Sequence, residues 1–238
     1  MEQYFYRECT RASIQEDHAE IVDGFHDVVK RGARVGLRLV NYYKGLPISY
    51  PATLVEMSGG VLELDVHPQQ AVALEATRCT FIKCSHFDRP LLAEVQNVDV
   101  RRMMASLHKF RFVEIMAEQR VSLRLELESP SDADILIEGS PVEGKVMDIS
   151  LGGFSIRPSR RCPLNEGTEV MLRVMVPDLV QNKETSLEIK ARIVENVTEE
   201  SGDICRFSIL SDAQAEGVIS RFIFQRQVDI IRELKEKS

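Results

Sequence analysis

A seven-residue pattern with the period of a β-strand occurs twice in this chain. Arg34–Val40 reads RVGLRLV and Arg120–Glu126 reads RVSLRLE, with apolar residues at alternate positions. A period of two sends successive side chains to opposite faces of a strand, so each segment is expected to be a strand with one buried face. One copy lies in each half of the chain, which indicates two β modules.

A second pair of similar segments follows the first pair. Leu54–Leu64 (LVEMSGGVLEL) resembles Val146–Ile156 (VMDISLGGFSI), and both have an acid, a serine and paired glycines before a strand-like run. The matching order favours an internal duplication over chance similarity. The second copy has a shorter acid and one more residue before the glycines, which redirects the groups beyond the turn.

Other strand-like runs are separated by turn residues in both halves. They are ATLVEM, GVLELDV, ALEATRCTFIKCS, LLAEVQNVDV and KFRFVEI, then ADILIEG, GKVMDIS, GFSIRP, EVMLRVMV, SLEIKARIVENV and ICRFSIL. This spacing predicts a mainly β protein with two small antiparallel β-barrels in tandem. We expect the barrels to occupy residues 1–113 and 114–238, with the boundary near Val113–Gln119.

An α-helix is expected toward each end of the chain. Ser13 and Glu16 form a capping box, and Gly32 is the expected stop of the N-terminal helix. The apolar face of that helix is Ile21, Val22, Phe25, Val28 and Val29. The C-terminal helix is expected over Ala213–Lys235, with an apolar stripe of Ile219, Phe222, Ile223, Ile230, Ile231 and Leu234.

The composition argues against several classes of protein. The formal net charge of −7 over 238 residues is unlike the basic footprint of a nucleic-acid-binding protein. The N-terminal residues have no apolar core of a signal peptide, and no apolar run is long enough to span a bilayer. The five cysteines form no paired framework. We therefore expect a cytoplasmic protein without membrane insertion.

Motifs of enzymes and metal sites are not found in the sequence. It contains no Walker loop, no G-x-S-x-G elbow and no H-E-x-x-H pair. Cys79, Cys84 and His86 would suggest zinc, but their segment has the pattern of a strand ending in a turn, and no fourth ligand is evident. We expect no catalytic residues, no metal and no cofactor.

The second copy carries the best candidates for a binding site. Arg120 and Arg124 share parity, so along an extended strand they would lie about 13 Å apart, a span suited to an extended ligand with several acceptors. The guanidinium fork donates in pairs and is the usual partner of the guanine O6/N7 edge. A solvated basic face is the alternative, and only the combination with the next motif makes the arginines informative.

That next motif is Asp148-Ile149-Ser150-Leu151-Gly152-Gly153. Asp148 can accept from guanine N–H donors, and Ser150 can donate to a phosphate oxygen or brace the turn. Gly152 and Gly153 are expected to allow a positive φ and a close approach of ligand to backbone. An ordinary turn capped by Asp148 and Ser150 remains the alternative. Together the residue types fit a guanine nucleotide bound without a metal.

Basic residues gather ahead of this motif. Between Arg101 and Arg124 the acids are Glu114 and Glu118, and the bases are Arg101, Arg102, Lys109, Arg111, Arg120 and Arg124. Such a connector would attract an anionic ligand, although a solvated basic loop is the alternative. Arg157 could line the rim of the site, with an ordinary surface position as the favoured alternative.

The two motifs together resemble the signature of the PilZ family, which comprises bacterial receptors for cyclic di-GMP. That signature is R-x-x-x-R followed by [D/N]-x-S-x-x-G, and Asp148 follows Arg124 by 24 residues. The resemblance covers Ala117–Glu236. The first half resembles the N-terminal barrel of two-domain, flagellar-brake-like members.

The resemblance implies a role for each residue of the motifs. Arg120 and Arg124 would contact guanine and phosphate groups, Asp148 and Ser150 would contact guanine or the turn, and Gly152 and Gly153 would shape the turn. Gln119 and Arg157 are secondary candidates. Members often have an aromatic residue inside the arginine motif and a basic residue beside it. This chain has Val121-Ser122-Leu123 and Gln119 there, which bears on affinity and on whether one ligand or an intercalated pair binds.

The function implied is that of a cyclic di-GMP effector. Ligand binding would close Arg120 and Arg124 onto Asp148–Gly153 and reorient the barrels toward a partner, with effects on motility, biofilm or exopolysaccharide. The family likeness suggests the flagellar motor, or exopolysaccharide or secretion machinery, as the partner, and leaves a homodimer open. The alternative is a ligand-free PilZ-like adaptor that acts only through protein–protein interaction.

Overall fold

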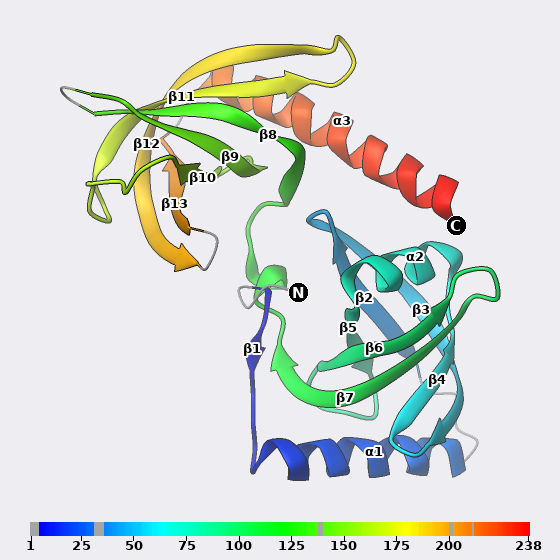
Figure 1. Ribbon diagram of the computed structural model, residues 1–238. Coiled ribbons are helices and arrows are strands. Elements are labelled where there is room, and N and C mark those ends of the chain that lie inside the picture. Colours follow the sequence, from blue (N-terminus) through cyan, green and yellow to red (C-terminus); the bar gives the residue numbers. More distant parts are fainter. Residues whose placement is uncertain (1–4, 31–35, 138–139, 200–201, 211) are drawn as a thin grey trace. The chain divides into compact units, whose positions relative to one another are not determined.

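Figure 1 shows the computed structural model of the protein, which describes residues 5–30, 36–137, 140–199, 202–210 and 212–238. The chain is mainly β with a helix toward each end, as predicted. It divides into two compact units. The first unit is Met1–Val121 together with Ile231–Ser238, and the second is Ser122–Ile230.

The first unit is a seven-stranded antiparallel sheet that closes on itself. The strand order is β1-β7-β4-β3-β2-β5-β6, and β6 also pairs with β7. The strands are β1 (Arg7–Glu8), β2 (Leu37–Tyr43), β3 (Leu46–Ser58), β4 (Val61–Asp65), β5 (Cys79–Cys84), β6 (Leu91–Asp99) and β7 (Met104–Glu114). The expected first barrel is thus confirmed as a closed ring of strands.

The first helix, α1 (Ile14–Lys30), packs against β7 and β3 along the edge of this ring (Figure 1). One of the two bonds of the predicted capping box forms, because the Glu16 N–H donates to Ser13 Oγ over 3.2 Å. The Glu16 carboxylate accepts from the Ser13 hydroxyl over 2.8 Å instead of from the Ser13 backbone N–H. Val29 was expected on the apolar face but is 38% exposed. Gly32, the expected stop, lies outside the described residues, as do Arg34 and Val35 of the first seven-residue pattern.

A second helix, α2 (Pro68–Thr77), lies where the sequence indicated a strand beginning at ALEAT. The helix begins with Pro68 at its first turn and His67 as its N-cap, and it ends at Arg78 in the left-handed conformation. Five consecutive residues from Gln70 to Leu74 are buried. A helix buried on most sides has no apolar stripe, which is why its period escaped sequence reasoning.

The second unit is a closed antiparallel barrel with the strand order β10-β13-β12-β11-β8-β9. Its strands are β8 (Arg124–Leu136), β9 (Val142–Ser150), β10 (Gly153–Pro158), β11 (Glu169–Asp178), β12 (Lys183–Glu199) and β13 (Gly202–Ile209). The core consists of the inward residues of these strands, among them Leu125, Ile149, Leu172, Ile189 and Phe207. The predicted second barrel is therefore confirmed.

The C-terminal helix is α3 (Ala213–Lys237), close to its predicted bounds. Five residues of the expected stripe are buried, namely Ile219, Phe222, Ile223, Ile230 and Leu234. Ile231 is 42% exposed, because it lies one residue past Ile230 and turns about 100° away from the buried face.

The second seven-residue pattern is not one continuous strand. Residues Met116–Gln119 form a short 3-10 helix, Arg120 follows it, and β8 begins only at Arg124. Val121 is fully exposed, whereas Leu125 is fully buried. The expected alternation therefore holds only from Arg124 onward. The separation of about 13 Å between the two arginines was expected for one extended strand and does not apply to this segment.

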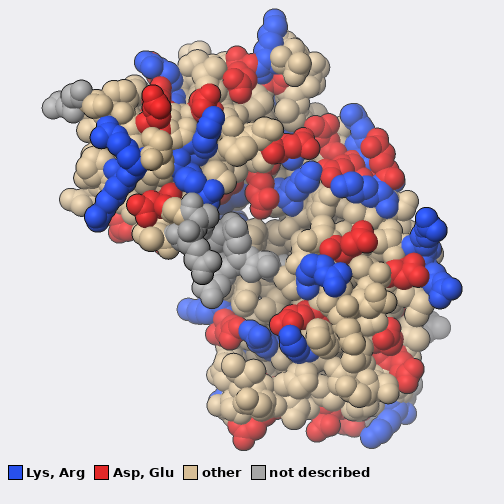
Figure 2. Space-filling model, in the orientation of Figure 1, with Lys and Arg blue, Asp and Glu red and all other residues tan. Residues whose placement is uncertain are grey.

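Within the described residues no helix is long and apolar enough to cross a membrane. Positive and negative side chains are interspersed on the face of each unit that Figure 2 shows. Cross-strand ion pairs of the second unit include Arg173 with Glu188 and Arg192 with Glu169.

Candidate functional site

The two sequence motifs of the second half are brought together by strand pairing. Arg124, the first residue of β8, lies opposite Ser150 at the end of β9, and Ser150 lies opposite Gly153 at the start of β10. Side chains directly opposite each other on antiparallel strands have Cβ atoms about 5 Å apart. The neighbouring positions Leu125 and Ile149 are fully buried, so Arg124 and Ser150 belong to the face that points away from the core.

A second row of residues lies next to the first on the same face. Glu126, Asp148 and Ser155 are opposite one another on β8, β9 and β10. Asp148 is thus diagonal to Arg124, at a Cβ distance of about 7–8 Å. The register between β9 and β10 shifts just past Ser155, and such bulges re-aim side chains beside functional sites.

Arg124 is half-buried, and its side chain makes no hydrogen bond or ion pair with any of the described residues. An arginine offers five N–H donors in a fixed fork. Arg124 is the first residue of β8 and lies opposite Ser150 on the outer face. Its donors can therefore bind a planar acceptor or a phosphate at this face.

Ser150 is 5% exposed and its hydroxyl donates to the carbonyl of Gly153 over 3.2 Å. Of the two roles expected for it, the structure shows the bracing of the turn. Asp148 is half-buried and has interactions of its own. The motif therefore combines an internal brace with an acidic group on the outer face.

The glycine pair differs from the expectation. Neither Gly152 nor Gly153 has a positive φ, whereas Gly59 and Gly60 in the first copy have φ values of 57° and 78°. Gly153 is buried against β13, where a Cβ would lie 1.9 Å from the carbonyl oxygen of Phe207. It is the close passage of two backbones, not a left-handed turn, that requires glycine at this position.

Sequence reasoning missed Arg206 on β13. Arg206 lies opposite Ser155 and therefore extends the row of Glu126 and Asp148 across a fourth strand. Its Nη1 donates to Glu195 Oε2 over 2.6 Å, and its side chain is 18% exposed. The alternation of Cys205, Arg206 and Phe207 in the run ICRFSIL was the signal that places it on the outer face.

Arg157 lies on β10 two residues beyond Ser155, so it has the same parity, and it pairs with Lys145 of β9. It is half-buried and has interactions within the molecule. Its placement on this face agrees with its selection as a secondary candidate.

Gln119 and Arg120 belong to the first unit by their contacts. Gln119 Nε2 donates to Glu114 Oε1 over 2.7 Å, and the Arg120 guanidinium lies 5.1 Å from the centre of the Phe5 ring. A cation over an aromatic face is a favourable contact. The structure thus brings Arg124, Asp148, Ser150, Gly152 and Gly153 together in the second unit, and it places Gln119 and Arg120 in the first.

The first copy of the motifs has a different arrangement. Arg38 lies opposite Pro51, and Ser58 follows Pro51 by seven residues, a span of about 23 Å along β3. Glu56 lies opposite a second carboxylate, Glu63. No cluster equivalent to the second copy forms from these residues, and the paired acids disfavour an anionic ligand.

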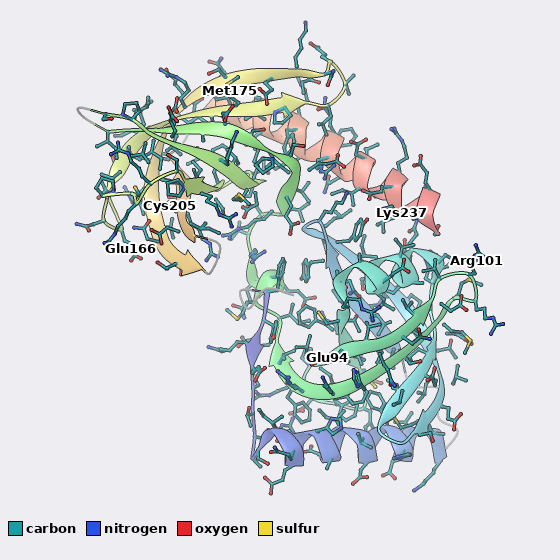
Figure 3. All side chains as sticks on the ribbon, in the orientation of Figure 1. Glu94, Arg101, Glu166, Met175, Cys205 and Lys237 are labelled. Atoms are coloured by element: carbon teal, nitrogen blue, oxygen red, sulfur yellow. The ribbon has the colours of Figure 1, made fainter. Side chains whose placement is uncertain are left out.

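Much of the basic connector is paired with acids of the first unit. Lys109 Nζ lies 2.7 Å from Glu94 Oε2, and Arg111 Nη1 lies 2.5 Å from Glu8 Oε1. The hydrogen bond from Lys109 lowers the pKa of Glu94. Arg101 is exposed at the turn between β6 and β7, and Figure 3 shows it pointing outward. Lys109 and Arg111 are therefore paired with acids of their own unit, and Arg101 is solvated.

Cys79 and Cys84 are buried at the two ends of β5. Among the described residues, no three histidine, cysteine or acidic side chains form a group that could hold a metal ion.

Comparison with known proteins gives a family for the second half of the chain. A comparison with curated proteins finds no match. Similar solved structures include Escherichia coli YcgR in complex with c-di-GMP, which is 15% identical and has a TM-score of 0.44, with 96% of this chain and 100% of that chain covered. The Bacillus subtilis inhibitor of motility MotI/DgrA is 13% identical with a TM-score of 0.43, covering 83% and 99% of the two chains. The K. pneumonia MrkH–c-di-GMP complex is 14% identical with a TM-score of 0.38, covering 93% and 97%.

The match to a family domain extends from the end of β7 into α3, over residues 114–225. It includes both sequence motifs and every strand of the second barrel. This chain therefore contains a PilZ domain, which occupies residues 114–225.

Proposed function

We propose that the protein is a cyclic di-GMP receptor whose ligand binds on the outer face of the PilZ barrel. Arg124 would donate to a guanine edge or a phosphate, and Asp148 would accept from guanine N–H donors. The hydrogen bond from Ser150 to Gly153 would hold the turn that connects β9 and β10. The observation that supports this most is the fork of Arg124, which lies beside Ser150 and diagonal to Asp148 and has no partner among the residues that the structure describes. The function is that of a receptor and not of an enzyme.

Arg120, Gln119, Arg157 and Arg206 would complete the site in this proposal. Because Arg120 belongs to the first unit and Arg124 to the second, a ligand held by both arginines would restrict how the two units are oriented. Such a ligand shifts the orientation only by its difference in affinity between arrangements. The restricted orientation would then be the state that a motility, exopolysaccharide or secretion protein recognises.

The test is calorimetric titration of the full chain with cyclic di-GMP, with GTP as the control nucleotide. Arg124→Ala is expected to weaken binding at least about tenfold, since hydrogen bonds to a charged group contribute about 1.5–3 kcal/mol. Arg38→Ala is the matched control, because Arg38 holds the same place in the first copy and donates instead to the carbonyl of Ser49 over 3.1 Å. Its affinity should equal that of the wild type.

The double variant Arg120→Ala/Arg124→Ala tests the contribution of the first unit. A loss of affinity greater than that of Arg124→Ala alone would support a role for Arg120 in binding. No heat and no change in melting temperature for the wild type would overturn the receptor proposal and favour the ligand-free adaptor.

A further inference from the structure

A cavity of about 720 Å³ lies in the second unit where β8 and β11 separate. The two strands pair only from Ala133 to Leu136 of β8, against Val174 to Met171 of β11. Beyond these pairs, Leu127–Ser131 form one wall, and Pro177–Leu179 belong to the other. Met175, labelled in Figure 3, is the first residue of β11 past the pairing. We call this opening the β8–β11 gap.

Strand edges face the β8–β11 gap. Met175 to Asp178 pair with β12 on one side, which leaves their other edge toward the gap. The register of β8 on β9 shifts between Glu126 and Ser131, so the intervening residues depart from the ladder. Main-chain groups on such edges can pair with an added extended segment.

Arg226 of α3 lies at the floor of the gap and is 3% exposed. Its Nε donates to the carbonyl of Glu126 over 3.3 Å, and its Nη1 lies 3.4 Å from Glu128 Oε2. Its buried Nη2 has no hydrogen-bond partner among the described residues. A buried donor without an acceptor is costly, so a ligand carbonyl that displaces the exposed Glu128 side chain would give this nitrogen the acceptor it lacks.

The remaining charge around the gap is mostly negative. The acids that line it are Glu128, Asp178, Glu184 and Asp229, and the bases are Lys183 and Arg226. Hydrogen bonds lower the pKa of Asp178 and favour its ionised form, and the bond from the backbone N–H of Gln181 has the largest effect. This balance disfavours an anion and favours a ligand with basic groups.

An exposed apolar side chain adjoins the acids. Leu179, which lines the gap next to Asp178, is 38% exposed. The backbone N–H of Leu179 donates to Gln225 Oε1 over 2.9 Å, which holds the turn between β11 and β12 against α3. An apolar side chain of a bound segment can bury this exposed surface.

We propose that the β8–β11 gap binds an extended, basic segment of a partner protein. The segment would pair through its main chain with a strand edge, place lysine or arginine near the acids and pack an apolar side chain on Leu179. The inference deepens the proposed function by naming the surface through which the receptor acts. Glu126 connects the two sites, because its carbonyl accepts from Arg226 while its side chain lies opposite Asp148 of the nucleotide face.

A phage-displayed library of random dodecapeptides, selected on the full chain with and without cyclic di-GMP, supplies the probe. Selected peptides should be rich in lysine or arginine and contain a large apolar residue. Fluorescence polarisation on the synthesised peptides should show binding weakened at least about tenfold by Glu184→Lys, because like charges then meet. Arg226→Met should also weaken it, and Glu143→Lys, an exposed acid of β9 outside the gap, should not.

Peptides without basic enrichment, or peptides that bind Glu184→Lys as tightly as the wild type, would overturn the proposal. Analytical ultracentrifugation separates another occupant, since self-association abolished by Glu184→Lys would assign the gap to a second copy of the chain instead. Titration of cyclic di-GMP into the same variants keeps the two proposals apart. A wild type that binds selected peptides but no nucleotide would overturn the receptor function alone.

Discussion

At the scale of single residues, the neighbours Gly152 and Gly153 differ in the space available for a side chain. A Cβ on Gly152 would lie 3.6 Å from Ser122 Oγ, an ordinary contact distance, whereas one on Gly153 would lie 1.9 Å from the Phe207 carbonyl oxygen. The atom in the way at Gly153 is backbone of a paired strand, so it cannot rotate aside. Only one glycine of the motif is therefore demanded by packing.

Gly153→Ala is expected to lower the free energy of unfolding by about 1–3 kcal/mol or more, because it forces β10 and β13 apart. Gly152→Ala, the matched control, should stay within about 0.5 kcal/mol of the wild type. Urea unfolding followed by circular dichroism measures both. Equal stabilities of the two variants would contradict the close passage seen at Phe207.

Two weakly acidic groups, the half-buried Tyr42 and the buried Cys205, predict how stability changes in alkali. Burial raises the pKa of Tyr42 to about 12 from its ordinary 10.0. Burial, followed by the neighbouring Cys162, raises the pKa of Cys205 to about 12 from 9.0. Both groups are neutral when protonated, so the folded state holds these protons more tightly than the unfolded state.

The stabilisation from these two groups is complete below the ordinary pKa values and is lost as pH rises toward 12. The urea midpoint should therefore fall between about pH 9 and about pH 11. Tyr42→Phe removes one titrating group and should make this fall shallower. An unchanged slope in that variant would show that Tyr42 ionises as freely in the folded protein as in the unfolded chain.

At the scale of elements, a buried polar network attaches α2 to β2. Asn41, Gln70 and Thr80 are all fully buried. Asn41 Oδ1 accepts from Gln70 Nε2 over 2.6 Å and from Thr80 Oγ1 over 2.7 Å, and Asn41 Nδ2 donates to the Cys79 carbonyl over 2.7 Å. Satisfied networks of this kind specify one packing of a core, because each member depends on the others.

Asn41→Ala is expected to destabilise the first unit by roughly 2 kcal/mol, since it leaves the buried Nε2 donor of Gln70 without the acceptor it has in Asn41 Oδ1. Hydrogen exchange should show reduced protection along α2. Asn97→Ala, at an exposed position of β6, is the control and should change neither quantity. Unchanged protection of α2 in Asn41→Ala would mean that apolar packing alone holds this helix.

At the scale of the whole molecule, the two units have separate cores and the motifs of the proposed site fall on both. A ligand that binds only the folded state stabilises it by an amount set by its concentration. This linkage gives the receptor proposal a consequence that does not depend on any partner.

Cyclic di-GMP at about one hundred times its dissociation constant should add about 2.7 kcal/mol to the stability of the PilZ barrel. Hydrogen exchange should show the gain in β9 and β10, and Arg124→Ala should abolish it at the same ligand concentration. A gain in protection confined to the strands of the first unit would mean that the ligand does not bind at the outer face of the PilZ barrel.

The sequence by itself determined the features that depend on local order. Alternation of apolar residues identified the β class, the capping box of Ser13 and Glu16 located the start of α1, and the spacing of Arg124 and Asp148 identified the PilZ motifs. These signals are read from residue types and their spacing along the chain, so no tertiary contact is needed to recognise them.

Tertiary structure decided what depends on neighbours distant in the chain. Residues Pro68–Thr77 form the helix α2 although their sequence shows no helical period of apolar residues. A helix that is buried on most sides lacks the polar face from which such a period is recognised. Tertiary structure also required glycine at position 153 through the Phe207 backbone and placed Arg206 in the row of Asp148. Strand pairing brings such residues together, and the register of a closed barrel is settled only when all of its strands are in place.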